Sequence, residues 1–354
     1  MTESSAEVTR SSEPETVLEV EGLSCALDTA DGRVKLVDDV SFTLRRGETL
    51  GIVGESGSGK TMLVRSLMGI APKSATVTGR IRLDGVDLLS LPKKQRRRTL
   101  GAGMGMVFQN PMTSLNPVVP IGRQIIEGLR YHHGVNRSDA RARAIELLEQ
   151  VGISDPASRI KQYPFQLSGG MRQRVVIASA LACDPDVLIA DEATTALDVT
   201  VQKQILDLIK EIQTARNMAS IIISHDLGVV AGRTDQLAVM YAGQAVEFGP
   251  TAQVFARNRH QYTSALLKAI PDLNADTHSR MLTIPGSPRR PTPNPVGCPF
   301  AGRCTAVTDI CREENPEPTL DEVSSAHWYR CHHPYDLDDR SLVDVADTVA
   351  AGQS

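Results

Sequence analysis

The sequence predicts an α/β protein whose core is a mostly parallel, buried sheet. Short apolar runs of strand composition alternate with segments of helical spacing, and continuous apolar strands of this kind belong to sheets covered on both faces. One stretch of purely helical spacing interrupts the alternation, and a proline-rich run followed by four cysteines ends it. We therefore expect an antiparallel β subdomain, a helical subdomain and a small cysteine-rich C-terminal module beside the core sheet.

Each expected element rests on its apolar spacing. Continuous or alternating apolar runs predict strands, and apolar positions three to four residues apart predict helices. Ser138 is expected to cap the helix that it begins, and Gly152 to end it. The expected elements are strands at 17–20, 40–44 and 49–53, helices at 60–68, 121–131, 138–151 and 169–182, a strand at 187–190, a helix at 201–212, and strands at 220–224, 236–241 and 244–248.

Changes of composition divide the chain into five parts. The opening residues are polar and lack the basic-then-apolar order of a secretion signal, and the run PGSPRRPTPNP cannot form a regular element. We expect a disordered tail at 1–16, an α/β domain at 17–270 with its helical subdomain at about 110–166, a linker at 271–295, a cysteine-containing module at 296–335 and an acidic tail at 336–354.

Charge and hydropathy argue against two classes of protein. The formal net charge is −4, so no overall basic field favours nucleic acid. The basic run at 93–98 is expected to be a solvated helix face. No apolar run approaches the about 18 residues that cross a bilayer. We expect a cytosolic protein that acts at a membrane only through a partner.

A glycine-rich loop indicates a nucleotide site. The sequence GESGSGKT at 54–61 fits the pattern G-x-x-x-x-G-K-[ST], with the strand-like ETLGIV before it and the helix-like TMLVRSLM after it. Backbone N–H groups and the helix N-terminus would hold ATP phosphates, with Lys60 on the outer phosphates and the Thr61 hydroxyl on Mg²⁺. The residues expected to bind ATP are Gly54, Ser56, Gly57, Ser58, Gly59, Lys60 and Thr61.

Two carboxylates follow the apolar run VLIA. Asp191 is expected to hold the Mg²⁺ shell across from Thr61, and Glu192 to orient or deprotonate the attacking water. The competing interpretation, an ordinary acidic strand end, is disfavoured by the phosphate loop in the same chain.

Five separated motifs resemble those of ABC-transporter ATPase subunits, in the same order and spacing. They are GESGSGKT, MVFQN, LSGGMRQR, IADEATTALD and the pair HD at 225–226, and the similarity runs from about residue 17 to 270. The resemblance implies a P-loop ABC ATPase fold and a head-to-tail dimer that closes on ATP.

The resemblance also implies roles for individual residues outside the loop. Ser168, Gly169 and Gly170 look like the signature turn that contacts the γ-phosphate of ATP held by the other subunit. They are expected to precede a helix that starts at Met171 and adds its dipole.

Three further residues match family positions by sequence. Gln109 resembles the glutamine that contacts Mg²⁺ and water and relays to the membrane subunit, and His225 resembles the switch histidine at the γ-phosphate. Asp198 resembles the acid of the loop between the two ATP sites. Glu192, Ser168 and His225 are all present, which implies competence on both faces of the dimer.

Two positions depart from the family pattern. Leu27 aligns where an aromatic residue usually stacks on adenine, so stacking is expected to be weaker or supplied from elsewhere. Ala193 stands where the family often has proline, which is expected to change little.

Three regions resemble the oligopeptide/dipeptide importer branch of the family. They are NPMTSLNPVVPIGRQIIEGL after Gln109, HQYTSALLKAIPDL at 260–273 and GCPFAGRC at 297–304. The resemblance implies peptide import with two membrane permease subunits, an extracytoplasmic solute-binding protein, and a second homologous ATPase subunit or a homodimer. It also implies a peripheral position on the cytoplasmic face of the inner membrane.

Two other functions remain open alternatives. Importers of this branch also carry nickel and other solutes, so the solute does not follow from the sequence. A soluble ABC ATPase acting on nucleic acid is disfavoured, because the signature lies only some sixty residues beyond Gln109 without a heptad run and the net charge is negative.

The cysteines fall into two groups. Cys25 and Cys183 lie in apolar-rich segments and are expected to be buried structural thiols. The other four are separated by five, six and nineteen residues, and four thiolates suit Zn²⁺ or a [4Fe–4S] cluster. This second group comprises Cys298, Cys304, Cys311 and Cys331.

The spacing of these four cysteines favours the cluster over zinc. The module lacks the C-x₂₋₄-C knuckle usual for structural zinc, and Pro299 follows the first of the four, as in many cluster sites. Similarity to the importer branch also implies a cluster here. Four unliganded thiols and nearby histidines as ligands are weaker alternatives; the histidines are His327, His332 and His333.

Overall fold

A computed structural model describes residues 15–109, 111–193, 198–270 and 283–335. Residues 1–14 of the expected tail at 1–16, residues 271–282 of the expected linker at 271–295 and the acidic tail at 336–354 lie outside the described residues. Thr16, expected in the tail, begins the first strand. Within the described part, no helix is both long enough and apolar enough to cross a bilayer.

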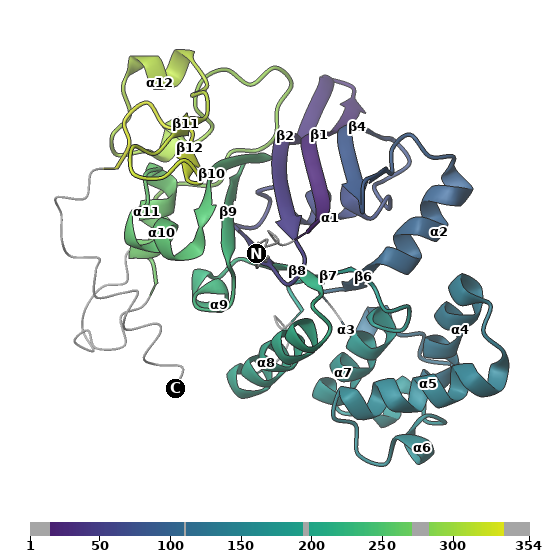
Figure 1. The fold of residues 1–354 in the computed structure, drawn as a ribbon. Coiled ribbons are helices and arrows are strands. Elements are labelled where there is room, and N and C mark those ends of the chain that lie inside the picture. Colours follow the sequence, from purple (N-terminus) through teal and green to yellow (C-terminus); the bar gives the residue numbers. More distant parts are fainter. Residues whose placement is uncertain (1–14, 110, 194–197, 271–282, 336–354) are drawn as a thin grey trace, which may run out of the picture.

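The first strands form an antiparallel sheet with the order β2-β1-β4-β5 (Figure 1). Strands β1 and β2 are three times longer than expected, because polar residues alternate with buried ones along both and hide the strand from a search for apolar runs. The expected antiparallel β subdomain is confirmed. Its strands are β1 (Thr16–Thr29), β2 (Gly32–Arg45), β4 (Ala75–Leu83) and β5 (Val86–Asp87).

A second, mixed sheet has the order β11-β12-β10-β9-β3-β8-β7-β6 within the described residues. Its strands from β9 to β6 are parallel, which confirms the buried parallel core. Strands β10, β12 and β11 extend it antiparallel. Its strands are β3 (Thr49–Val53), β6 (Met104–Val107), β7 (Val187–Asp191), β8 (Ala219–Ser224), β9 (Gln236–Tyr241), β10 (Gln244–Pro250), β11 (Thr319–Leu320) and β12 (Trp328–Tyr329).

Helices cover this mixed sheet and form a separate group at one side. Helix α1 (Lys60–Leu67) packs with β1, β2 and β7, and α8 (Val199–Ala215) packs with α7. The helical group lies beside β6 and β7 in Figure 1 and shares one apolar cluster with them. It comprises α3 (Pro111–Ser114), α4 (Ile121–His133), α5 (Arg137–Gln150), α6 (Pro156–Arg159), the 3₁₀ turn η1 (Pro164–Gln166) and α7 (Gly169–Ala180).

Helix α5 begins one residue and helix α8 two residues before the expected position. Helix α5 begins at Arg137, and the side chain of Asn136 caps it by accepting a hydrogen bond from the Asp139 N–H at 3.0 Å. Ser138 is therefore inside the helix, because an asparagine two residues earlier already satisfies the free N–H group. Gly152 adopts a φ of +74° directly after the helix end, as expected for its stop.

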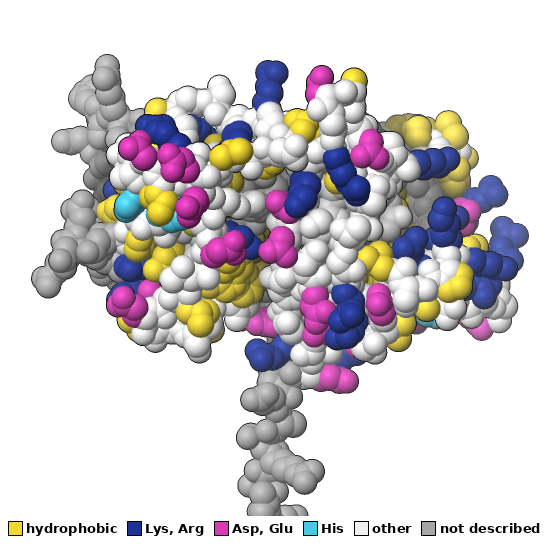
Figure 2. All heavy atoms as spheres, turned by 90° about the horizontal axis from the view of Figure 1, so that it is seen from above, with side chains coloured by type: hydrophobic (Ala, Val, Ile, Leu, Met, Phe, Trp, Pro, Cys, Tyr) yellow, Lys and Arg dark blue, Asp and Glu magenta, His cyan; other side chains and the backbone are white. Residues whose placement is uncertain are grey.

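The basic run at 93–98 lies on α2 (Lys93–Gly103), where Leu100 is the buried residue. Lys93, Lys94, Arg97 and Arg98 are exposed, as a solvated helix face requires. In Figure 2, Lys and Arg side chains gather at the side of the molecule where Figure 1 places α2, α4 and α5, whereas acidic and basic side chains mix elsewhere on this face.

The C-terminal segment packs onto the mixed sheet instead of forming a core of its own. Residues 283–297 contain neither helix nor strand, as expected for the proline-rich run. Beyond them, Cys298, Phe300 and Cys311 join the apolar cluster of β9, β10 and α11. The C-terminal segment contains the 3₁₀ turn η2 (Ala301–Arg303) and α12 (Asp309–Glu313). The helices that precede it are α9 (Leu227–Val230), α10 (Thr251–Ala256) and α11 (Gln261–Lys268).

A buried polar pair also ties this segment to the sheet. The Glu247 carboxylate on β10 lies 2.8 Å from His327 Nε2 and accepts hydrogen bonds from the backbone N–H groups of Arg259 and His260. Because Glu247 and His327 are almost completely buried, each supplies the partner that burial of the other requires.

Candidate functional site

The loop between β3 and α1 follows the backbone that its glycines allow. Gly54 and Gly59 have φ values of +151° and +103°, which side-chain-bearing residues rarely adopt. A Cβ on Gly59 would lie 2.7 Å from the Leu36 carbonyl oxygen. Ser56, Gly57 and the following Thr61 are exposed. The loop therefore presents backbone to solvent at the start of a helix, the arrangement that binds anions.

Lys60 is the buried cation of the loop, with a residue exposure of 4%. Its Nζ donates to the Gly54 carbonyl at 2.6 Å, the Glu55 carbonyl at 2.9 Å and Ser58 Oγ at 3.4 Å. Burial lowers the pKa of Lys60, while the negative charges of Glu192, Asp191 and Glu55 oppose that shift. The lysine is thus held in the loop beside the strand-end carboxylates.

The parallel sheet brings the other expected residues to the same edge. Val53 pairs with Ser224, and Asp191 pairs with Ile223, so β3, β8 and β7 end together. The phosphate loop, His225 and Glu192 follow these strand ends directly. Gln109 follows the neighbouring β6. Residues far apart in the sequence are therefore collected at the carboxyl edge, where open α/β sheets bind their ligands.

Glu192 is the centre of this arrangement. Its Oε2 accepts a hydrogen bond from Gln109 Nε2 at 2.5 Å, and its Oε1 lies 3.6 Å from His225 Nδ1. Its backbone has a φ of +45°, an uncommon value for a residue other than glycine and one that clusters at functional sites. Glu192 thus lies against both of the other residues expected to act in catalysis.

Asp191 precedes Glu192 and is buried. Burial raises the pKa of Asp191, and the charge of Glu192 adds to the rise, while Arg65 and Lys60 oppose it. Arg65 on α1 is a neighbour that sequence reasoning did not single out, because nothing in a helix pattern says which strand end the helix will face.

The Ser-Gly-Gly turn at 168–170 lies in the helical group, at the start of α7. Ser168 caps α7, since its Oγ accepts a hydrogen bond from the Met171 N–H at 3.3 Å. The helix begins at Gly169, as expected for the helix at 169–182 and two residues before the start at Met171 expected for the turn, so both glycines lie in its first turn. Ser168 and Gly169 are exposed, and α7 packs with α3, α4 and α5.

Asp198 and Leu27 have simple structural positions. Asp198 caps α8 by accepting a hydrogen bond from the Val201 N–H at 3.0 Å. Leu27 is half-buried on β1, paired with Val34 on β2 and Ala75 on β4. The effect of Leu27 on adenine stacking stays a prediction.

The four C-terminal cysteines line one small pocket, although they come from different parts of the segment. Burial, with a further contribution from the other cysteines, raises the pKa of Cys298 to about 11. Burial likewise raises the pKa of Cys304 and Cys331. Even so, among the described residues no group of three or more His, Cys, Asp or Glu side chains has an arrangement that could hold a metal ion.

The other titratable residues named from the sequence have ordinary partners. His332 Nε2 lies 3.1 Å from the Glu314 carbonyl oxygen, and His333 Nε2 lies 2.7 Å from Thr308 Oγ1. Cys25 is buried, as expected. Cys183 is half-buried, and burial raises the pKa of its thiol.

Comparison with known proteins identifies the class to which this fold and site belong. Residues 37–195 match the ABC transporter family, and residues 246–311 match the oligopeptide/dipeptide transporter C-terminal region. The solved structure of cbiO1 from Clostridium perfringens, part of an ABC transporter complex, has a TM-score of 0.59 and 29% identity over 68% of this chain and 91% of that chain. The dimeric cassette MJ0796 shares the fold at 23% identity, with a TM-score of 0.59, over 66% of this chain and 98% of that chain.

Two relatives are much more similar in sequence. The dipeptide transport ATP-binding protein DppD of Escherichia coli is 46% identical over 90% of this chain and 97% of its own length. The oligopeptide transport ATP-binding protein OppD of Salmonella typhimurium is 45% identical over 90% of this chain and 94% of its own length. The chain therefore belongs to the ABC transporter family, in the branch of ATP-binding subunits with the oligopeptide/dipeptide C-terminal region.

Proposed function

We propose that this chain hydrolyses ATP to drive the import of peptides through an ABC transporter. The observation that carries the proposal is the contact of Gln109, Glu192 and His225 at the sheet edge that also holds the phosphate loop. The peptide-transport names of the two relatives support the choice of solute.

The residues at this edge suit ATP with Mg²⁺. The N–H groups of the loop and the Lys60 ammonium would bind the phosphates, and the oxygen-bearing side chains of Thr61, Gln109 and Asp191 are the donor type that Mg²⁺ takes. Bound there, the ion would neutralise phosphate charge. Glu192 would orient and deprotonate the attacking water, with His225 facing the γ-phosphate.

We propose that two ATP-binding subunits complete each other's sites. The turn of Ser168, Gly169 and Gly170, whose first two residues are exposed, would contact the γ-phosphate of ATP held by the partner, and Asp198 would lie between the two sites. The exposure of the turn supports this role, since free helix N-termini bind anions. The partner is a second homologous subunit or another copy of this chain.

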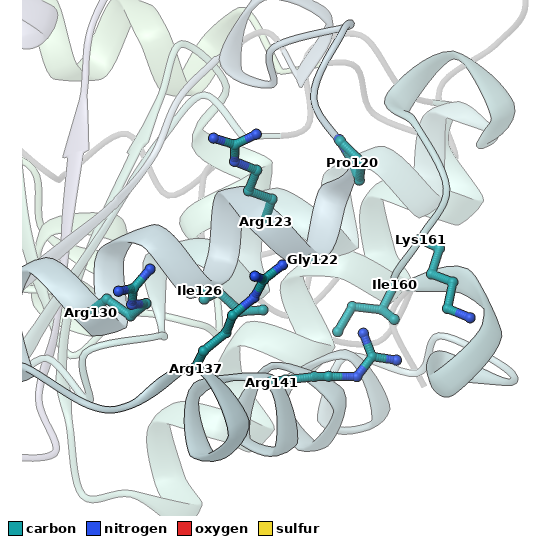
Figure 3. A pocket seen from close by; sticks show the side chains of 9 residues that line it. All are labelled: Pro120, Gly122, Arg123, Ile126, Arg130, Arg137, Arg141, Ile160 and Lys161. Atoms are coloured by element: carbon teal, nitrogen blue, oxygen red, sulfur yellow. The ribbon is translucent and has the colours of Figure 1, made fainter.

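The helical group is the proposed contact with the two membrane permease subunits. A pocket of about 530 Å³ between α4 and α5 is lined by five basic side chains (Figure 3). In the part of the chain that the structure describes, none of the five pairs with a carboxylate, whereas the neighbouring Arg143 pairs with Glu146 and Asp184. They would accept acidic side chains of a permease, and they are Arg123, Arg130, Arg137, Arg141 and Lys161.

Transport assays test the function. In vesicles that contain the two permeases, the solute-binding protein and both ATPase subunits, ATP should drive uptake of a labelled dipeptide or oligopeptide. Arg141→Glu should lower this uptake, while Arg143→Ala serves as the matched control.

Uptake of nickel instead of peptide would favour the other solute class. ATPase activity stimulated by DNA or RNA, without uptake, would favour the soluble alternative.

The proposed location is peripheral, on the cytoplasmic face of the inner membrane, with an extracytoplasmic solute-binding protein on the other side. We also propose the following division of the chain: a tail at 1–16, an α/β domain at 17–270, a linker at 271–295, a cysteine-containing module at 296–335 and an acidic tail at 336–354. Release of the chain from membranes by removal of the permeases would support the peripheral location.

We propose a [4Fe–4S] cluster, with Zn²⁺ as the alternative, at the four cysteines of the C-terminal segment. The support is that all four thiols line one pocket, although their sulfurs do not form a ligand group as they stand. The role would be structural or redox-sensing. Iron and sulfide analysis of anaerobically purified protein, with its absorption spectrum, tests this; stoichiometric zinc without iron would contradict the cluster.

A further inference from the structure

One ion pair joins the C-terminal segment directly to the phosphate loop. Arg303 lies in the turn η2, and Glu55 is the second residue of the loop. Arg303 Nη1 donates to Glu55 Oε2 at 2.6 Å, and Nη2 donates to Glu55 Oε1 at 3.0 Å. This two-point geometry matches the guanidinium fork to the carboxylate. The arginine side chain is 6% exposed, so water screens the pair weakly.

Arg303 is held in place by several other groups. Its Nε donates to the Pro285 carbonyl at 2.7 Å, and Nη1 lies 3.4 Å from the Tyr241 hydroxyl. The guanidinium also lies near the rings of Tyr241 and Phe300. These contacts hold the guanidinium at the position where it meets Glu55.

Glu55 is held on its backbone as well as on its side chain. Its N–H donates to the hydroxyl of Tyr262 on α11 at 2.9 Å. Its carbonyl accepts from Lys60 Nζ at 2.9 Å. A shift of the Glu55 backbone would therefore move a hydrogen-bond acceptor of Lys60, the buried cation of the phosphate loop.

We propose that Arg303 is a positioning residue for ATP binding, acting through Glu55. Without Arg303, the Glu55 carboxylate would stand uncompensated in the loop that receives the ATP phosphates, and like charges repel. With Arg303 in place, that charge is neutralised and the loop is fixed in the form that presents its N–H groups.

The other ion pairs of the segment do not reach the loop. Arg330 pairs with Asp39, and Arg257 pairs with Asp321. In contrast, Arg303 stands between Phe300 and Cys304, both of which line the cysteine pocket. Arg303 therefore lies beside the cysteine pocket in sequence and contacts the phosphate loop through its side chain.

The test compares variants of the full chain in ATP binding, ATPase kinetics and thermal unfolding. Arg303→Ala should raise the KM for ATP roughly tenfold and change kcat less than about twofold, since the loss is one of binding. Arg303→Lys keeps the charge and should recover part of the affinity. Arg312→Ala, which removes an exposed arginine of the same segment, should leave the KM unchanged.

A double variant separates positioning from simple stability. In Glu55→Gln the carboxylate is absent, so adding Arg303→Ala should change the KM less than about twofold. An Arg303→Ala protein with the KM of Arg312→Ala would overturn the proposal. So would a double variant that binds ATP as weakly as Arg303→Ala alone. If Arg303→Ala fails to fold, Arg303→Lys with and without Glu55→Gln gives the same comparison.

Discussion

The chain contains two glycine-bearing turns, and each is followed by the first turn of a helix. The two turns differ in their burial and in the residues that surround them. The phosphate loop at 54–61 lies at the sheet edge, where Lys60 is buried and the side chains proposed to act in catalysis follow the neighbouring strands. The turn at 168–170 lies in the helical group, is mostly exposed and bonds to its own helix through Ser168.

From this difference we propose that the two turns are halves of one site that a single copy does not assemble. The loop has the lysine, the carboxylates and the histidine beside it. The turn has two exposed residues, Ser168 and Gly169, at the start of a helix, a position that favours an anion. Two copies placed head to tail would give each loop the turn that it lacks, and the predictions below test this comparison.

The largest effect on ATP hydrolysis is expected from a substitution beside the phosphate loop that leaves the turn at 168–170 unchanged. Glu192→Gln should lower ATP hydrolysis by about 10³-fold, because the general base is lost, while ATP binding is retained. Phosphate release and binding of a fluorescent ATP analogue measure the two effects. Glu149→Gln, at an exposed glutamate on α5, is the control. Near-normal turnover would remove Glu192 from the mechanism.

The next experiment tests whether the two turns work across a dimer. Lys60→Ala should disable the loop, and Ser168→Arg should block the turn, so each variant alone should lose roughly 100-fold in ATPase activity. An equimolar mixture of the two variants should recover up to about a quarter of normal activity, since half of the random dimers would hold one complete site. Activity no higher than the mean of the two variants would contradict exchange between copies.

A smaller effect concerns α11, which supports the loop but not the turn. His260 caps α11 by accepting a hydrogen bond from the Tyr262 N–H, and burial lowers the pKa of His260 to about 3. The unfolded chain takes up this proton below pH of about 6.5 and the folded chain does not, so stability falls as pH falls from about 6.5 to about 3. His260→Asn keeps a cap and removes the titration.

The expected size follows from proton linkage. At pH 5 this histidine should cost the normal protein about 2 kcal/mol of unfolding free energy relative to pH 8, a loss that His260→Asn should not show. Urea unfolding at the two pH values measures the difference. Parallel pH profiles for the two proteins would show that His260 is protonated in the folded state.

The smallest effect tests how the turn is held. Ser168→Ala should lower the unfolding free energy by about 1 kcal/mol, because α7 loses its side-chain cap. Asn136→Ala should cost α5 a similar amount. Ser138→Ala is the control and should change stability little, since Asn136 is the cap. A larger loss for Ser138→Ala than for Asn136→Ala would reverse the assignment of the α5 cap.

The local apolar pattern predicted many of the strands and helices. It failed where burial depends on residues that lie far away in the sequence. Strands β3 and β9 begin and end where apolar composition places them, because each is buried on both faces. Strands β1 and β2 were underestimated, because their exposed positions carry polar residues. The separate cysteine module was also expected, but its apolar residues join the core of β9 and α11.

By itself, the sequence determined which residues are proposed to carry the chemistry: the loop with Lys60, the carboxylates at 191–192 and the Ser-Gly-Gly turn. Only the tertiary structure decided that Gln109 and His225 meet on Glu192, since that contact depends on the strand order β3-β8-β7-β6. It also decided that Arg303 binds Glu55 from 248 positions away. Propensities act over a few residues, whereas these partners are set by packing of the whole chain.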